Sequence, residues 1–267
     1  PIERAFNTNG RVTLRNNMIL NPGITFSQLP GTYSDRNSRG GPAVRHSPLV
    51  NGFLSFTGDD RKQLIPSFYI SAGRSDYGRG GWWEVNPSAD LRVSSRFHMN
   101  LGVDYHHNRD DTQWYGNFTD STGVTHYTFA HLNQQTLSAT LRFDVTATPN
   151  LTFQLYASPF VTKGSYSNIR EVGDARAADY FKRYKPYTDE TVLANQPSGF
   201  NVKQFRSNAV VRWEYRPGST LYLVWTQQRT GAIPMAGSEN FYGNYSSLFN
   251  LHPDNTFLVK MSYWFNR

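Results

Sequence analysis

The chain has 267 residues, no cysteine, a hydrophobic fraction of 38%, an aromatic fraction of 15% and a formal net charge of +7. The lack of cysteine excludes a disulfide framework and a cysteine-based metal site. No stretch approaches the roughly 20 apolar residues of a membrane-spanning helix, which excludes transmembrane helices. Transmembrane β-strands stay open, because only every second residue of such a strand has to face lipid.

The beginning of the chain carries no signal of export. No basic segment followed by an apolar one precedes the first patterned residues, and residues 2–8 enter in the middle of a strand-like pattern before a turn at Asn9-Gly10. Either a signal peptide was removed or the sequence is a fragment, and the mid-pattern start favours the second: we expect residues 1–267 to form a single domain that is the C-terminal fragment of a longer protein.

Strict alternation of apolar and polar residues predicts β-hairpins along the rest of the chain. Short turns lie near Asp59, Ser95, Pro149 and Gly218. The strand pairs around these turns are 49–56 with 64–72, 83–93 with 97–105, 137–145 with 151–157, and 205–215 with 221–226. About ten strands are expected in all, each close to the roughly 9 to 11 residues that a tilted spanning strand needs.

The two faces of these strands differ in chemistry. The apolar face has Trp or Tyr near strand ends, as in the aromatic girdles of a lipid-facing band. The opposite face carries ionic residues, which we expect to line a solvated lumen. These lumen-lining candidates are Glu84, Asp90, Arg92, His98, Asp104, His106, Arg142, Asp144, Arg206, Arg212, Glu214 and Lys260.

The connections alternate in length. Long polar or aromatic loops are expected at residues 31–47, 73–81, 108–131, 164–199 and 230–255, between the short turns. Outer-membrane barrels alternate short periplasmic turns with long extracellular loops in this way. The predicted fold class is therefore all-β, an antiparallel transmembrane β-barrel of about ten or more strands, located in the bacterial outer membrane.

The last strand fixes the expected orientation. Its apolar face resembles the C-terminal signal by which outer-membrane barrels are recognised for insertion, with Phe265 as the terminal aromatic residue before Asn266 and Arg267. The residues of this signal are Phe257, Val259, Met261, Tyr263 and Phe265. With the C-terminus periplasmic, every long loop falls on the extracellular side.

Several phrases resemble one family: RGGP at 39–42, TLSATLRFDVTATPNLTFQLYASPFVTKGSYSN from Thr136, ADYFKRY from Ala178, FNVKQFRSNAVVRWEYRPGSTLYLVWTQQR from Phe200, and HPDNTFLVKMSYWF from His252. They look like the C-terminal outer-membrane barrel domain of unknown function found behind family 9-like carbohydrate-binding domains in Gram-negative bacteria. The resemblance implies a larger barrel whose full-length members begin with a signal peptide and an N-terminal binding domain, both absent here.

One loop motif stands out. Arg39, Gly40, Gly41 and Pro42 permit a sharp backbone excursion followed by a fixed step. The motif predicts a structural turn; in the alternative interpretation, Arg39 and Arg45 line a constriction that attracts an anionic solute.

Metal binding and catalysis find little support in the sequence. His98 and His106 are eight residues apart on one strand, over about 25 Å at roughly 3.3 Å per residue, too far to share an ion. Asp104 and His106 could pair, but two ligands fall short of a zinc site. A hydrolase on the loop rim, built from Ser121 and His126 or from Asp110 and Asp111, remains an alternative. No cofactor is expected.

Residues 175–184 could form a short surface helix, in a loop whose aromatic side chains either stack on sugars or pack over the barrel mouth. These aromatic residues are Tyr166, Tyr180, Phe181, Tyr184 and Tyr187.

The leading functional hypothesis is an integral outer-membrane barrel for solute passage or for surface binding, with carbohydrate as the class that the resemblance implies. Expected partners are outer-membrane lipid, lipopolysaccharide and the barrel-insertion machinery. Nucleic acid is not expected, because the basic residues do not cluster. A third hypothesis is a soluble β-sandwich or propeller that binds glycans, in which the apolar faces would meet in a core.

Overall fold

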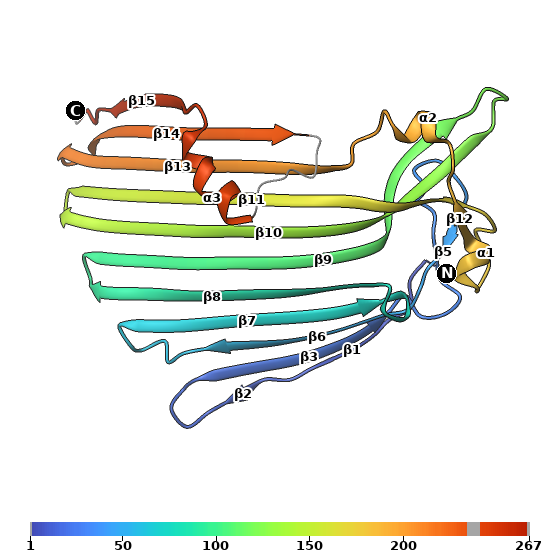
Figure 1. Cartoon of the computed structure of the whole chain (residues 1–267). Coiled ribbons are helices and arrows are strands. Elements are labelled where there is room, and N and C mark those ends of the chain that lie inside the picture. Colours follow the sequence, from blue (N-terminus) through green and yellow to red (C-terminus); the bar gives the residue numbers. More distant parts are fainter. Residues whose placement is uncertain (1, 234–240, 266–267) are drawn as a thin grey trace.

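The computed structural model describes residues 2–233 and 241–265, and its main feature is one large antiparallel sheet (Figure 1). The all-β prediction is confirmed. The strands are β1 (Phe6–Asn9), β2 (Val12–Thr13), β3 (Ile19–Ser27), β4 (Tyr33–Ser34), β5 (Val44–Arg45), β6 (Leu49–Thr57), β7 (Leu64–Ser75), β8 (Gly80–Ser94), β9 (Phe97–Thr119), β10 (Thr125–Thr148), β11 (Leu151–Val172), β12 (Tyr184–Pro186), β13 (Gly199–Arg216), β14 (Ser219–Ile233) and β15 (Asp254–Ser262). The helices are η1 (Asp76–Gly78), α1 (Tyr180–Arg183), α2 (Glu190–Leu193), α3 (Phe241–Ser247) and η2 (Leu248–Asn250).

The sheet is a meander that runs from the blue strands to the red ones in Figure 1. Its neighbour order is β1-β3-β6-β7-β8-β9-β10-β11-β13-β14-β15, with β2 also on β3 and β12 also on β11. β4 and β5 pair with each other in a separate small sheet. β1 and β15 are the two edges, and in the described part of the chain they do not pair with each other. The described sheet is therefore open.

Cross-strand register joins the alternation of single strands into continuous rows. One apolar row runs through Leu91, Met99, Phe143, Leu155, Ala209, Trp225 and Phe257. The polar row beside it runs through Asp90, Asn100, Arg142, Tyr156, Asn208, Thr226 and Thr256. Because successive side chains of a strand point to opposite sides, the two rows lie on opposite faces of the sheet.

The apolar face toward the short turns has no layer packed over it. Trp213 is 49% exposed and Leu223 is 45% exposed, while Phe143 and Leu155 are half-buried. The other sheet in the described residues, β4 with β5, lies at the opposite end of the strands (Figure 1). In the described chain the apolar side chains of this region do not meet in a core between two sheets.

The two ends of the sheet are built differently. Short turns at residues 58–63, 95–96, 149–150 and 217–218 share one end, and Gly218 there has a φ of +76°, a conformation that favours glycine. The opposite end carries the connections that hold β4, β5, α1, β12 and α2 (Figure 1). The expected loop 230–255 belongs to β14, α3, η2 and β15, and its residues 234–240 lie outside the described chain.

Two expected loops prove to be mostly strand. Residues 108–131 form a hairpin, because β9 runs on to Thr119 and β10 begins at Thr125. The Asp120 carboxylate closes its turn by accepting from the Thr122 and Val124 backbone N–H groups, both at 2.9 Å. Residues 73–81 are likewise the ends of β7 and β8 with η1 between them. Polar residues occur on both faces of these extensions, with apolar ones such as Phe129 and Trp114 at irregular positions, so their sequence lacks the alternation that marks a strand.

The buried core lies at the loop end. Val44, Phe129, Tyr180 and Tyr184 pack together there, with Trp114, Val172 and Ala175 against them. The expected helix at 175–184 is reduced to α1, whose N-cap Asp179 accepts from the backbone N–H groups of residues 181 and 182. Three aromatic residues of this loop, Tyr180, Tyr184 and Tyr187, are buried, whereas Phe181 is 76% exposed. The loop aromatics therefore mostly pack.

α3 and η2 fold back over β11, β13 and β14 (Figure 1). The Asn201 side-chain amide donates to the Asn244 side chain at 2.8 Å, and the rings of Phe205 and Phe249 are 5.3 Å apart. Leu248 is fully buried beneath them. In the part of the chain that the structure describes, none of the helices has the length and apolarity that a bilayer crossing requires.

Candidate functional site

The RGGP motif at 39–42 forms a tight turn in the connection between β3 and β6. Arg39 (φ 48°) and Gly40 (φ 102°) lie in the left-handed region, and the Ser38 hydroxyl donates to the carbonyl of the motif's proline at 2.8 Å. The side-chain amide of Asn117 on β9 donates to the carbonyl oxygens of Ser38 and Arg39, both at 3.1 Å. The turn is thereby fixed against the β9–β10 hairpin.

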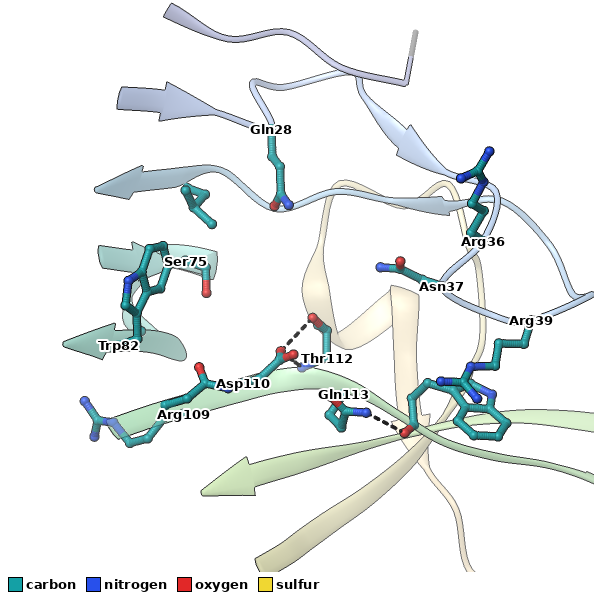
Figure 2. A pocket seen from close by; sticks show the side chains of 14 residues that line it. Gln28, Arg36, Asn37, Arg39, Ser75, Trp82, Arg109, Asp110, Thr112 and Gln113 are labelled. Atoms are coloured by element: carbon teal, nitrogen blue, oxygen red, sulfur yellow. Dashed lines mark hydrogen bonds between the residues drawn. The ribbon is translucent and has the colours of Figure 1, made fainter. Parts of the chain in front are cut away.

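This connection encloses a cavity of about 460 Å³ against β8 and β9, which we call the loop-end cavity. Figure 2 shows Arg36, Asn37 and Arg39 on one side of it, and Trp82 and Arg109 on the other. The remaining lining residues are Gln28, Leu49, Ser75, Gly81, Asn108, Asp110, Thr112, Gln113 and Trp114.

The lining of the loop-end cavity is positively charged. It includes two guanidinium groups, Arg36 and Arg39, and one carboxylate, Asp110, which gives a net charge of +1; Arg109 borders the cavity, but its side chain points away from it (Figure 2). Asp110 accepts from the backbone N–H of Thr112 at 2.8 Å and from its hydroxyl at 3.0 Å (Figure 2). A concave, positively charged lining raises the local concentration of negatively charged solutes.

Two indoles complete this lining. The Arg39 guanidinium lies 3.8 Å from the ring centroid of Trp114, a cation–π contact, and the Trp114 indole N–H donates to the Asn117 side chain at 3.0 Å. Trp82 lies over Gly73 of the neighbouring strand, where a Cβ atom would come within 2.3 Å of the ring. Glycine at position 73 is therefore what lets the indole lie flat across the sheet.

A buried ionic network holds the connection between β11 and β13 onto β9. The Asp111 carboxylate accepts from Arg170 at 2.8 Å, from the His131 ring at 3.0 Å and from the Tyr180 hydroxyl. Asp111 and Tyr180 are each 8% exposed. Burial raises the pKa of the Tyr184 hydroxyl beside this network to about 12, so that side chain is neutral at physiological pH.

A second ionic clamp holds the tip of the β9–β10 hairpin. The His126 ring contacts the Glu171 carboxylate through Nδ1 and the Asp120 carboxylate through Nε2, the latter at 3.3 Å. The hydrogen bond to Glu171 raises the pKa of His126, and Asp120 acts in the same direction. Both ring nitrogens are therefore engaged with carboxylates, and this histidine is not free to act as a base for Ser121.

The proposed hydrolase rim is not assembled from the other candidates. Asp110 faces the loop-end cavity and Asp111 belongs to the buried network. The two neighbouring carboxylates therefore do not share one site. No group of three or more His, Cys, Asp or Glu side chains in residues 2–233 and 241–265 could hold a metal ion.

The lumen-lining candidates lie on the polar face in small groups. His98 contacts Asp90 at 2.7 Å and Asp144 at 3.6 Å, and Arg92 pairs with Asp90 at 2.9 Å. Further pairs are Arg212 with Glu214 at 3.2 Å, Glu84 with Ser71 at 3.4 Å, and Asp104 with Asn86 at 3.5 Å. Register places His106 opposite Glu84, Arg206 opposite Gln228, and Lys260 opposite Tyr222.

The sequence did not identify Trp82, Trp114, Arg36 or Arg109 as parts of a site. The available signal is the run of three charges Arg109-Asp110-Asp111, which stands three residues before Trp114. In a loop, as expected for residues 108–131, such a run is ordinary.

Fold and site together define an all-β protein with one amphipathic antiparallel sheet and a polar, arginine-rich cavity at its loop end. The domain of unknown function DUF5916 matches residues 2–266, and the chain belongs to this family. A comparison with curated proteins gave no match.

Proposed function

We propose that the chain forms the wall, or part of the wall, of an antiparallel transmembrane β-barrel in the bacterial outer membrane. Its apolar face is directed toward lipid and its polar face toward the lumen. The exposed apolar face carries the proposal, since Trp213, Leu223 and Val259 are 49%, 45% and 68% exposed. Apolar surface in water costs about 25 cal/mol per Å², so a face this extensive needs a cover. Lipid provides one without any second layer of protein.

The open edges set a condition on this proposal. Unpaired backbone N–H and C=O groups are not tolerated in hydrocarbon, so a sheet in the membrane must close. β1 and β15 must therefore pair in the membrane, with each other or with strands outside the described residues.

The last strand suits the role of insertion signal. Phe257, Val259, Met261, Tyr263 and Phe265 are 45% to 83% exposed along one face, and Asn266 and Arg267 lie outside the described residues. The barrel-insertion machinery is the proposed partner of this strand. Lipid and lipopolysaccharide are the proposed partners of the apolar face.

The loop-end cavity suits a polar solute. Indole rings stack on sugar rings, and guanidinium and amide groups hydrogen-bond hydroxyls, so Trp82, Arg39 and Asn37 offer what a saccharide needs. The resemblance of the chain to barrel domains that follow carbohydrate-binding domains also supports carbohydrate as the class of solute. We propose that the protein binds or passes polar, carbohydrate-type solutes and has no catalytic role.

Membrane fractionation of the parent protein, with boiled and unboiled samples compared by gel mobility, tests the membrane part. We expect recovery in the outer membrane and a mobility that changes on boiling. Recovery in the soluble fraction without such a change contradicts it.

Swelling of proteoliposomes in isosmotic glucose, together with tryptophan fluorescence during glucose titration, tests the solute part. A lack of both responses contradicts solute passage and binding but leaves the membrane assignment standing.

A further inference from the structure

A second, smaller cavity of about 210 Å³ lies beyond the loop-end cavity. Its charged and polar lining comes from three separate segments that the fold brings together: the connection after β5, the η1 turn and α1. We call it the arginine pocket, after Arg45, Arg79 and Arg183; His46, Ser47 and Asp76 complete its polar lining.

The arginine pocket carries more positive than negative charge. Asp76 is the carboxylate in its lining, and it lies 3.7 Å from Arg79 and 3.8 Å from Arg183. Arg45 makes no ion pair in the described part of the chain. Three guanidinium groups against one carboxylate leave a net charge of +2 around the cavity.

Two of these groups are held rigidly. Arg183 is 3% exposed and donates to the Ser47 hydroxyl at 2.8 Å and to the Ala177 carbonyl at 3.3 Å. The Arg79 guanidinium lies 4.2 Å from the ring centroid of Tyr180, which fixes its plane. Rigid guanidinium forks are preorganised to bind the paired oxygens of carboxylate or phosphate groups.

Hydrogen bonding in the arginine pocket is incomplete within the described residues. The buried Nε of Arg183 and the buried Oδ2 of Asp76 have no hydrogen-bond partner there. A buried donor such as the Arg183 Nε–H is costly unless an acceptor, for example an oxygen of a bound anion, compensates it, whereas the Asp76 oxygen calls for a donor such as a hydroxyl. Burial lowers the pKa of His46; the charge of Glu3 opposes this shift and that of Arg183 adds to it, and the net change is downward, so this ring adds no charge near pH 7.

Shared lining residues make the arginine pocket a neighbour of the loop-end cavity. A small cavity of about 50 Å³ between them shares Gln28, Asn37 and Thr112 with the loop-end cavity. It shares Arg45 and Asp76 with the arginine pocket. A solute in the loop-end cavity therefore lies near the arginine pocket, with the small cavity between them.

We propose that the arginine pocket binds the oxyanion of a small acidic solute, a carboxylate or a phosphate group. The volume suits such a group with part of its carrier, since it falls below the roughly 300 Å³ at which whole drug-sized ligands begin to fit. This inference deepens the proposed function and rests on it for the route by which the solute arrives. The preferred solutes are then acidic sugars or sugar phosphates.

Isothermal titration calorimetry on the full chain in detergent tests the proposal. The probes are glucuronate, inorganic phosphate and, as a neutral match for the first, glucose. The variant is the double substitution Arg45→Gln with Arg79→Gln, and the matched control is Arg176→Gln, an exposed arginine near α1 outside all three cavities. We expect at least one anion to bind the native chain and the control alike, and the double variant to lose at least tenfold in affinity.

Tighter binding of glucuronate identifies a carboxylate solute, and tighter binding of phosphate a phosphorylated one; either supports the proposal. No binding of either anion, or equal affinity in the double variant, overturns it. An equal loss of glucose affinity in the double variant also overturns the proposal, because an oxyanion site does not discriminate through contacts that a neutral sugar makes equally well. If the double variant does not fold, the same titrations are made with Arg45→Gln alone, and the same outcomes support or overturn the proposal. Anion binding without glucose-driven swelling contradicts solute passage alone, so the two failures are distinguishable.

Discussion

Toward its short turns the sheet exposes apolar side chains such as Leu223 and Val259, whereas toward its loops it buries charged ones such as Asp111 and Arg183. The same strands pass through both regions. Near the turns, stability must come from whatever covers the apolar face, since the described chain supplies no second layer. Near the loops, the chain supplies its own core and its own ionic network. One sheet is thus stabilised by its surroundings at one end and by its own tertiary contacts at the other.

The largest effect is expected from breaking the ionic network at the loop end. Asp111→Ala leaves the nearly buried Arg170 without its partner, which typically costs about 3–5 kcal/mol. Chemical unfolding and limited proteolysis of the 173–198 connection measure the loss. Asp110→Ala is the matched control, because its carboxylate bonds only locally to Thr112 in the described chain. Equal losses in both variants contradict the assigned role of Asp111.

A charge on the apolar face tests the turn end. Leu223→Arg is expected to cost about 2–4 kcal/mol in a bilayer and to reduce the heat-modifiable form. Val224→Arg places the same charge one residue away on the polar face, where it is solvated, and a much smaller loss is expected. Folding of both variants in lipid vesicles, followed by gel mobility, gives the comparison. Equal behaviour of the two variants argues against a lipid-facing side.

A smaller effect is expected inside the loop-end cavity. Arg39→Ala removes the cation–π contact with Trp114, worth about 0.5–1 kcal/mol at an exposed site, and should change the tryptophan emission. Arg36→Ala removes a charge from the same lining without a ring contact in the described chain. An emission spectrum altered equally by both substitutions assigns the effect to charge rather than to stacking.

The smallest effect is expected from pH at the hairpin tip. The pKa of His126 is raised in the folded chain above its ordinary value of 6.5, so its stabilising contribution is fully present below that value. The contribution is lost as pH rises through the raised folded pKa. Hydrogen exchange of the 117–127 backbone should therefore quicken with pH across that window, beyond its intrinsic pH dependence. His126→Gln should abolish this extra step, and its persistence in the variant contradicts the assignment to His126.

Sequence patterns located the strands where one face is apolar and the other polar. Around Pro149 and Gly218 the strands and turns agree with the alternation, because burial of one face imposes a period of two. The extensions of β9 and β10 escaped prediction because polar residues occur on both of their faces and the apolar ones do not alternate regularly. The cavities escaped it for another reason. They depend on contacts such as Asn117 with Ser38, across 79 positions of the chain, which no local pattern records.

The length of the β9–β10 hairpin decides which part of the protein an external particle would meet first. β9 has 23 residues, which at about 3.3 Å per residue and a tilt of about 45° climb about 54 Å. The apolar band of an outer-membrane barrel is only about 25 Å tall. Because β9 and β10 bend before their tip (Figure 1), the turn at residues 120–124 stands above the lipid in the proposed orientation by less than the roughly 30 Å that straight strands would reach. An antibody or a phage would meet this tip before any other described part of the sheet, which makes it the natural position for an epitope tag on intact cells.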